Sequence, residues 1–309
     1  MMTTLERRAP WAPWAGLYLF VWAGAVAMLV AIDGLEAAAP ALIIGGLFAG
    51  LLPGVVWLLT RKSDPITVPV ARPAVEMAGV GGWLLIYAIV CLGWLFTVIK
   101  QAVPPGTQEF KLVMLAVKLA IHVAIPLLIL KLLGAKLGPL FKVRWGQRGV
   151  LALFVIVGGL SIGINILLSP WLTHLMALNP TASVLAWAAP GAFLWMALEA
   201  GLCEEVLFRA ILQSRLAAVL RSEAGAAVIA ALVFGLAHAP GLFLRPDTGG
   251  DAIAGGLPGI LAYTVGVLSP IGLTYGVIWA RTRNLWLLVA LHATVDFLPN
   301  LADFIKVWG

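Results

Sequence analysis

Long apolar stretches separated by short polar ones run through the whole chain. Nine of them are long enough to cross about 30 Å of hydrocarbon as helices that rise 1.5 Å per residue. They cover residues 15–32, 37–60, 78–99, 110–133, 149–168, 186–212, 224–244, 257–280 and 284–305. This pattern predicts an all-α protein, a polytopic bundle of eight to nine transmembrane helices.

The composition supports this interpretation. Of the 309 residues, 62% are hydrophobic and 11% are charged, whereas a soluble domain carries about 25% charged residues. A soluble fold of this length has no interior large enough for so many apolar side chains. We therefore predict an integral membrane protein.

The basic residues are distributed unevenly between the predicted helices. With the N-terminus in the cytoplasm, the cytoplasmic side holds Arg7, Arg8, Arg61, Lys62, Arg72, Lys131, Lys136, Lys142, Arg144, Arg148, Arg215, Arg221, Arg281 and Arg283. The opposite side holds Lys100, Lys111, Arg245 and Lys306. Because Lys and Arg are enriched on the cytoplasmic side of membrane proteins, we predict a cytoplasmic N-terminus. The net charge of +6 then reflects topology, and we expect no nucleic-acid partner.

A proline-containing loop at residues 60–72 separates the first two predicted helices from the others. We predict that residues 1–73 form a peripheral transmembrane hairpin. Residues 74–309 would then form the core, with its functional motifs within residues 199–296.

An EExxxR sequence interrupts the apolar stretch near residue 200. Glu204, Glu205 and Arg209 all fall inside the predicted helix 186–212. An ionised side chain in hydrocarbon costs about 2.5–3.5 kcal/mol even on insertion scales, so such residues need partners. Residues four apart share a helical face, so Glu205 and Arg209 can form an ion pair. Glu204 is rotated from Glu205 by about 100° and can point into a cavity.

Two later predicted helices carry ionisable residues at a similar depth. His238 ends the sequence FGLAH, and His292 and Asp296 enclose HATVD. Measured from the charged ends of their helices, Glu204, His238, His292 and Asp296 lie roughly 14–22 Å deep. We therefore predict that they form one site. Two histidines and two carboxylates suffice to hold a metal ion or to carry out acid–base hydrolysis, and the residues alone leave both open.

The order of these motifs resembles that of a known family. EExxxR, FxxxH from Phe234 to His238 and HxxxD from His292 to Asp296 are similar to the motifs of the CAAX-protease and bacteriocin-processing (CPBP, Abi-type) intramembrane endopeptidases. The similarity covers about residues 185–300. The sequence also lacks the HExxH motif of zinc metalloproteases and the GxSG and GxGD motifs of other intramembrane proteases.

The resemblance implies an enzyme that hydrolyses peptide bonds of membrane-associated peptides or proteins. Glu204 would be the general base that activates a water molecule. His238 and His292 would position that water, bind a metal, or both, and Asp296 would orient the water or help to stabilise the oxyanion. If zinc is the cofactor, its ligands would be Glu204, His238 and His292, and Glu205 would then serve as the base.

The resemblance also implies a location and partners. We expect the inner membrane of a bacterium, a peptide or membrane-protein substrate, and a site that opens to the cytoplasm or laterally to lipid. The motifs do not indicate that the substrates are prenylated.

Two functions of other classes stay open. Deep Glu, His and Asp residues also build the proton relays of transporters, although these often contain inverted repeats and the N-terminal half shows no matching motifs. The second alternative to a protease is a non-catalytic membrane scaffold. Three further polar residues inside predicted helices, Lys118, His122 and Glu199, are expected to have interhelical or interfacial roles.

Overall fold

The computed structural model describes residues 11–63, 66, 68–168, 170–244 and 253–309. Arg7, Arg8 and Arg245, which enter the predicted charge distribution, lie outside these residues, as does part of the loop at 60–72. Within the described ranges every regular element is a helix and no strand is present, which confirms the predicted all-α class.

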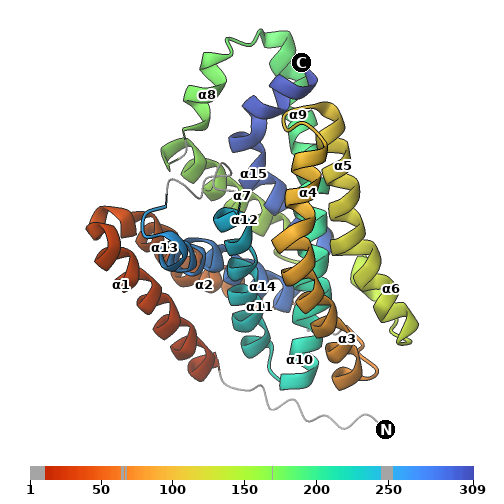
Figure 1. The fold of residues 1–309 in the computed structure, drawn as a ribbon. Coiled ribbons are helices and arrows are strands. Elements are labelled where there is room, and N and C mark those ends of the chain that lie inside the picture. Colours follow the sequence, from red (N-terminus) through yellow and green to blue (C-terminus); the bar gives the residue numbers. More distant parts are fainter. Residues whose placement is uncertain (1–10, 64–65, 67, 169, 245–252) are drawn as a thin grey trace.

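The chain folds into α-helices joined or interrupted by short π-helical and 3₁₀ segments (Figure 1). The α-helices are α1 (Trp11–Ile44), α2 (Leu52–Thr60), α3 (Pro73–Ile86), α4 (Phe96–Ala102), α5 (Gln108–Leu119), α6 (Ile125–Leu132), α7 (Val150–Leu168), α8 (Trp171–Ala177), α9 (Ala182–Met196), α10 (Ser214–Leu220), α11 (Glu223–Ala237), α12 (Ala239–Leu244), α13 (Gly256–Tyr263), α14 (Ser269–Thr282) and α15 (Leu285–Trp308). The other segments are η1 (Gly45–Leu51), η2 (Tyr87–Leu95), η3 (Ala120–Ala124), η4 (Gly138–Phe141), η5 (Ala197–Leu202), η6 (Glu205–Gln213) and η9 (Thr264–Leu268).

Among the described residues, eight helical stretches are long and apolar enough to cross a membrane. The first, Trp11–Thr60, contains 50 residues, which corresponds to about 75 Å of continuous helix, more than twice the hydrocarbon thickness. Its backbone leaves the helical region at Asp33 and Gly34, and Gly34 has φ +78°. This kink divides the first stretch at the boundary between the two predicted spans 15–32 and 37–60. The structure therefore agrees with the predicted eight to nine helices, eight if the kinked stretch is counted once and nine if it is counted as two.

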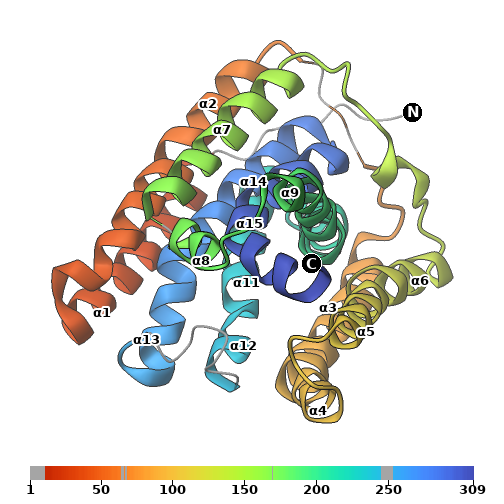
Figure 2. The same ribbon diagram turned by 90° about the horizontal axis from the view of Figure 1, so that it is seen from above.

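Seen from above, the helices form two groups around a central pair (Figure 2). Helices α3, α4, α5 and α6 lie on one side, α1, α2, α7, α13 and α14 lie on the other, and α9 and α15 lie between them. This arrangement brings the segment with EExxxR next to both groups.

The N-terminal helices pack closely against the later ones. The Tyr18 hydroxyl lies 3.0 Å from the Ser269 hydroxyl, and the indole N–H of Trp22 donates to the carbonyl of Gly266 at 3.1 Å. The division into a peripheral hairpin at 1–73 and a core at 74–309 stays a prediction.

Two glycines allow the motif-bearing helices to approach their neighbours. A Cβ atom at Gly201 would lie 2.7 Å from the carbonyl oxygen of Val289 on α15. At Gly235 it would lie 2.5 Å from the carbonyl oxygen of Thr264 in η9. A larger residue at Gly201 would push apart the helices that carry Glu204 and His292, and one at Gly235 would displace the helix that ends next to His238 from η9.

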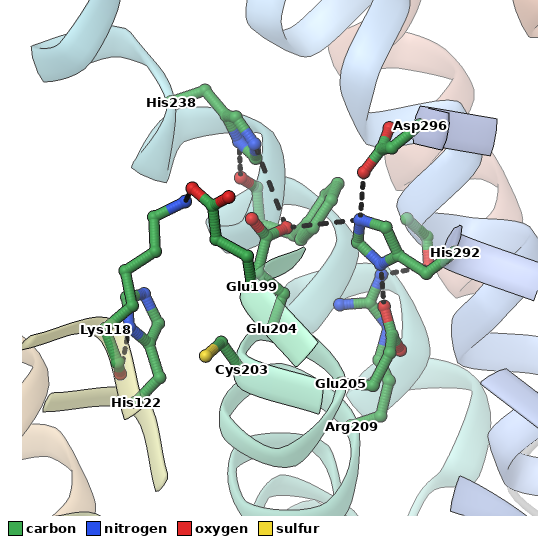
Figure 3. Close-up of polar contacts among 12 residues, drawn as sticks. Lys118, His122, Glu199, Cys203, Glu204, Glu205, Arg209, His238, His292 and Asp296 are labelled. Carbon is green, nitrogen blue, oxygen red and sulfur yellow. Dashed lines mark hydrogen bonds and ion pairs between the residues drawn. The ribbon is translucent and has the colours of Figure 1, made fainter. Parts of the chain in front are cut away.

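The helix with EExxxR is locally widened. Residues five apart share a face of a π-helix, and π-helical turns are frequent at functional sites. Here η5 and η6 flank Glu204, which lies five residues after Glu199. Figure 3 shows these two side chains projecting from the helix on the same side, toward His238 and Lys118 respectively.

Candidate active site

Glu204 is the centre of a cluster of polar side chains (Figure 3). Its Oε2 atom lies 3.6 Å from Nε2 of His292 and 3.9 Å from Nε2 of His238. The same oxygen is buried and accepts no hydrogen bond, and the side chain is 18% exposed. The structure therefore brings together three of the residues that were predicted to meet.

His292 on α15 is held on both sides of its ring. Its Nδ1 atom lies 2.8 Å from Oε1 of Glu205, and its Nε2 atom lies 3.2 Å from Oδ2 of Asp296. The Glu205 carboxylate can only accept, so Nδ1 donates to it. This bond turns Nε2 toward Glu204 and Asp296, and Glu205 thereby orients the ring.

The ring of His238 is held by a hydrogen bond to the backbone of Phe234, four residues earlier in the chain. Its Nδ1 atom lies 2.8 Å from the carbonyl oxygen of Phe234, which fixes Nδ1 as the donor and leaves Nε2 toward Glu204. This bond joins residues four positions apart, which is the distance between Phe and His in the FxxxH motif. The Phe234 ring also contacts the His238 ring edge-on, with centroids 4.9 Å apart.

The ion pair that the EExxxR spacing predicts is present. Nε of Arg209 lies 3.4 Å from Oε2 of Glu205, and both side chains are completely buried. The guanidinium group lies over the Phe234 ring, 4.5 Å from its centroid, and 6.0 Å from the ring of Tyr275. Arg209 thus offsets the charge of the carboxylate that orients His292.

A cavity of about 830 Å³ reaches this cluster. Glu204 and His238 line it, as do Lys118 and His122. The cavity continues between η2 and α4 on one side and α12, η9 and the end of α15 on the other. A polar inner end joined to a largely apolar passage is typical of a small-molecule or peptide site.

The wall of the cavity near α5 contains a second polar group. Nζ of Lys118 lies 3.0 Å from Oε1 of Glu199, and the indole of Trp195 donates to Oε2 of the same carboxylate. His122 bonds the carbonyl of Lys118 through Nδ1 at 3.0 Å and the Tyr87 hydroxyl through Nε2 at 2.9 Å. The interhelical contact expected for Lys118 and Glu199 is present, but their position on the cavity beside Glu204 was not predicted. The four-residue spacing of Lys118 and His122 is the one sequence signal that could have indicated it.

The donor types around Glu204 are those that zinc prefers, namely two imidazole nitrogens and a carboxylate, with each imidazole held through its other nitrogen. However, the described residues contain no group of three or more His, Cys, Asp or Glu side chains placed to hold a metal ion. The zinc ligands Glu204, His238 and His292 stay a prediction.

Comparison with known families gives a match to the segment that contains these residues. Residues 186–298 match the family described as type II CAAX prenyl endopeptidase Rce1-like. The resemblance to CAAX proteases is thereby confirmed over this segment. No curated protein and no solved structure matches the chain.

The Rce1-like match indicates that the protein is a protease of the membrane. The matched segment includes Glu199 and all six candidate residues of the cluster around Glu204. It does not include Lys118 or His122, so one wall of the cavity comes from outside the Rce1-like segment.

Proposed function

We propose that the protein is an intramembrane endopeptidase in which Glu204 activates the water that hydrolyses the peptide bond. The observation that carries this proposal is the surroundings of Glu204. Its unpartnered oxygen faces Nε2 of His238 and His292 at the inner end of a cavity, and each histidine is oriented through Nδ1. A general base needs an oxygen that is free to accept a proton, next to a cavity and beside neighbours of fixed orientation.

In the proposed reaction a water molecule binds between Glu204 and the histidines. Glu204 takes a proton from the water as its oxygen attacks the carbonyl carbon of the substrate. The same proton then passes to the leaving amine as the C–N bond breaks, which returns Glu204 to its carboxylate form. Atoms and charge balance without a further reactant.

His238 and His292 have different positions in this scheme. His238 lines the cavity and its side chain is 34% exposed, so we assign it contact with the bound substrate. His292 is nearly buried, and its Nε2 lies within reach of both Glu204 and Asp296. We assign it, together with Asp296, the orientation of the water. A carboxylate cannot donate a hydrogen bond to an oxyanion unless it is protonated, which favours this role for Asp296.

Glu205 is a poor candidate for the base. Its two oxygens contact His292 and Arg209, and its side chain is completely buried. A substrate or water in the cavity would therefore meet Glu204 first. We assign Glu205 and Arg209 the positioning of His292.

Zinc dependence is a separate proposal. Incubation of purified protein with a chelator, followed by re-addition of zinc, distinguishes the two schemes. Unchanged cleavage supports the metal-free scheme, whereas loss that zinc restores supports a metal held by Glu204, His238 and His292.

The substrate class follows from the shape of the cavity. A volume of about 830 Å³ is within the range of about 300–1,000 Å³ typical of ligand pockets. Its apolar side chains, including Phe96, Phe110 and Met114, suit an apolar peptide segment. We therefore propose membrane-associated peptides or proteins as substrates and the lipid bilayer as the surrounding medium.

The experiment that tests this function compares protein termini in cells that carry the native protein or Glu204→Gln. The matched control is Glu36→Gln, which removes a carboxylate from an exposed position near the kink of α1. We expect defined fragments to disappear in Glu204→Gln alone. If all three strains give the same fragments, the protein is not a Glu204-dependent protease, and a transporter or scaffold function is favoured.

A further inference from the structure

The two ends of the helix bundle differ in charge. In Figure 1 the start of α3, the end of α6 and the turn between α10 and α11 lie at the lower side, whereas the turn between α4 and α5, α8 and the start of α9 lie at the upper side. Many basic residues of the described chain lie at or near the start of α3, the end of α6 and the turn between α10 and α11, or near the ends of α2 and α14 and the start of α7. They are Arg61, Lys62, Arg72, Lys131, Lys136, Lys142, Arg144, Arg148, Arg215, Arg221, Arg281 and Arg283.

Side-chain contacts show that these basic residues share one end of the molecule. Arg281 on α14 donates to Thr60 at the end of α2, and Ser63 donates to the carbonyl of Arg148 before α7. Arg72 before α3 donates to the carbonyl of Leu133 after α6.

Two ion pairs also lie at this end of the molecule. Arg215 on α10 pairs with Glu76 on α3 at 3.2 Å, and Arg283 pairs with Glu223 at the start of α11. Arg215 is completely buried, so this basic side chain does not lie at the surface. We refer to this region as the basic end.

The cavity that contains Glu204 extends in the other direction. Its outer residues include Lys100 and Pro105 at the end of α4, Lys111 on α5, and Asp303 near the end of α15. The starts and ends of these helices meet there, because the side chain of Gln108 donates to the carbonyl of Val307 at 3.1 Å. The cavity therefore reaches the end opposite the basic end.

A buried layer separates the cavity from the basic end. Phe208 lies at the cavity and is 2% exposed, and Arg209, Gln213 and Arg215 follow it along the helix with no exposed surface. Gln213 donates to the carbonyl of Gly276 at 2.7 Å, which ties this layer to α14. A substrate has no path to Glu204 through these side chains.

We infer that the cavity opens on the non-cytoplasmic face of the membrane, so that the substrates are exported peptides or the outer segments of membrane proteins. Basic residues mark the cytoplasmic end of a membrane protein, and the cavity opens at the opposite end. The substrate part of this inference rests on the proposed function, whereas the orientation does not. It departs from the opening to the cytoplasm or laterally to lipid that the sequence resemblance implied.

Cysteine labelling tests the orientation. Glu109→Cys and Asp303→Cys place a thiol at exposed positions of the cavity end, and Lys142→Cys and Arg221→Cys place one at exposed positions of the basic end. The native Cys91 and Cys203 are buried. Each variant is treated in right-side-out vesicles with a membrane-impermeant maleimide, and again after solubilisation, which should label all four.

We expect intact vesicles to label the two cavity-end variants and to leave the two basic-end variants unlabelled. Labelling of the basic end, or protection of the cavity end, would overturn the inference. The same labelling is repeated in a Glu204→Gln background, where no proteolysis is expected. An orientation that persists without cleavage separates a failure of this inference from a failure of the proposed function.

Discussion

Two groups of charged residues flank Glu204, and they differ in their access to solvent. On one side, Glu205, Arg209 and His292 form a closed group in which the Glu205–Arg209 pair has no exposed surface. On the other side, Lys118 and Glu199 form an ion pair whose side chains are 24% and 13% exposed and in which Lys118 lines the cavity. We call these the buried wall and the cavity wall.

This difference indicates that the buried wall stabilises the fold and that the cavity wall contacts the substrate. A charge left alone in a dry interior costs several kcal/mol, whereas a pair next to water contributes little. The buried wall should therefore behave as one unit with the helix packing around Glu204. The cavity wall can change with moderate effects on folding and larger effects on substrate binding.

The largest effect is expected for Arg209→Leu. This change leaves the Glu205 carboxylate buried without its partner, and loss of one partner of a buried pair costs about 3–5 kcal/mol. We expect little folded protein, measured as the monodisperse fraction after extraction in detergent.

A double variant, Glu205→Leu with Arg209→Leu, is the control for this prediction. It removes both charges, so it should restore much of the folded fraction while leaving His292 without its orienting carboxylate and the enzyme slow. If the double variant folds no better than Arg209→Leu alone, the buried charge is not the cause of the loss.

A smaller effect is expected for His122→Phe on the cavity wall. It removes the two bonds of the His122 ring, to the Tyr87 hydroxyl and to the carbonyl of Lys118, and a single hydrogen bond contributes about 0.5–1.5 kcal/mol. A thermal unfolding curve in detergent measures the change. Tyr87→Phe removes the bond to His122 but leaves the bond between His122 and the Lys118 carbonyl, so it should destabilise less than His122→Phe. A larger loss for Tyr87→Phe would contradict this account of the two bonds.

The smallest effect on stability is expected for Lys118→Met. The pair with Glu199 is partly exposed to the cavity, so its loss should destabilise the fold less than loss of the completely buried pair of Glu205 and Arg209. The effect should instead be found in cleavage, as a several-fold rise in KM with a smaller change in kcat. Lys306→Met breaks the exposed pair with Asp303 and serves as the matched control with no expected change in stability. A loss of stability as large as that of Arg209→Leu would remove the distinction between the two walls.

Local spacing made much of the buried wall predictable from the sequence. Glu205 and Arg209 are four residues apart, and so are His292 and Asp296, so helical geometry alone places each pair on one face. The helical class and the spans followed from the apolar stretches. The apolar stretches on either side of Asp33 and Gly34 predict two separate spans, and the structure joins them into one kinked helical stretch.

The cavity wall could not be predicted in the same way. Lys118 and Glu199 lie 81 positions apart, and which helices become neighbours depends on packing that no local pattern records. The π-helical turns beside Glu204 change which residues share a face, and ideal α-helical spacing does not reveal them. The contact between Arg215 and Glu76, 139 positions apart, escaped prediction for the same reason.

The rate at which Glu204→Gln cleaves an identified substrate tests the central claim most directly. Native protein and the variant are purified, placed in bilayers and compared at equal folded concentration, with unfolding temperatures measured in parallel. Loss of a general base is expected to lower kcat by about 10²- to 10⁴-fold with an unchanged unfolding temperature, because the amide keeps the shape of the side chain. Cleavage within about threefold of the native rate, from a protein that is equally folded, would contradict the role of Glu204 as the base.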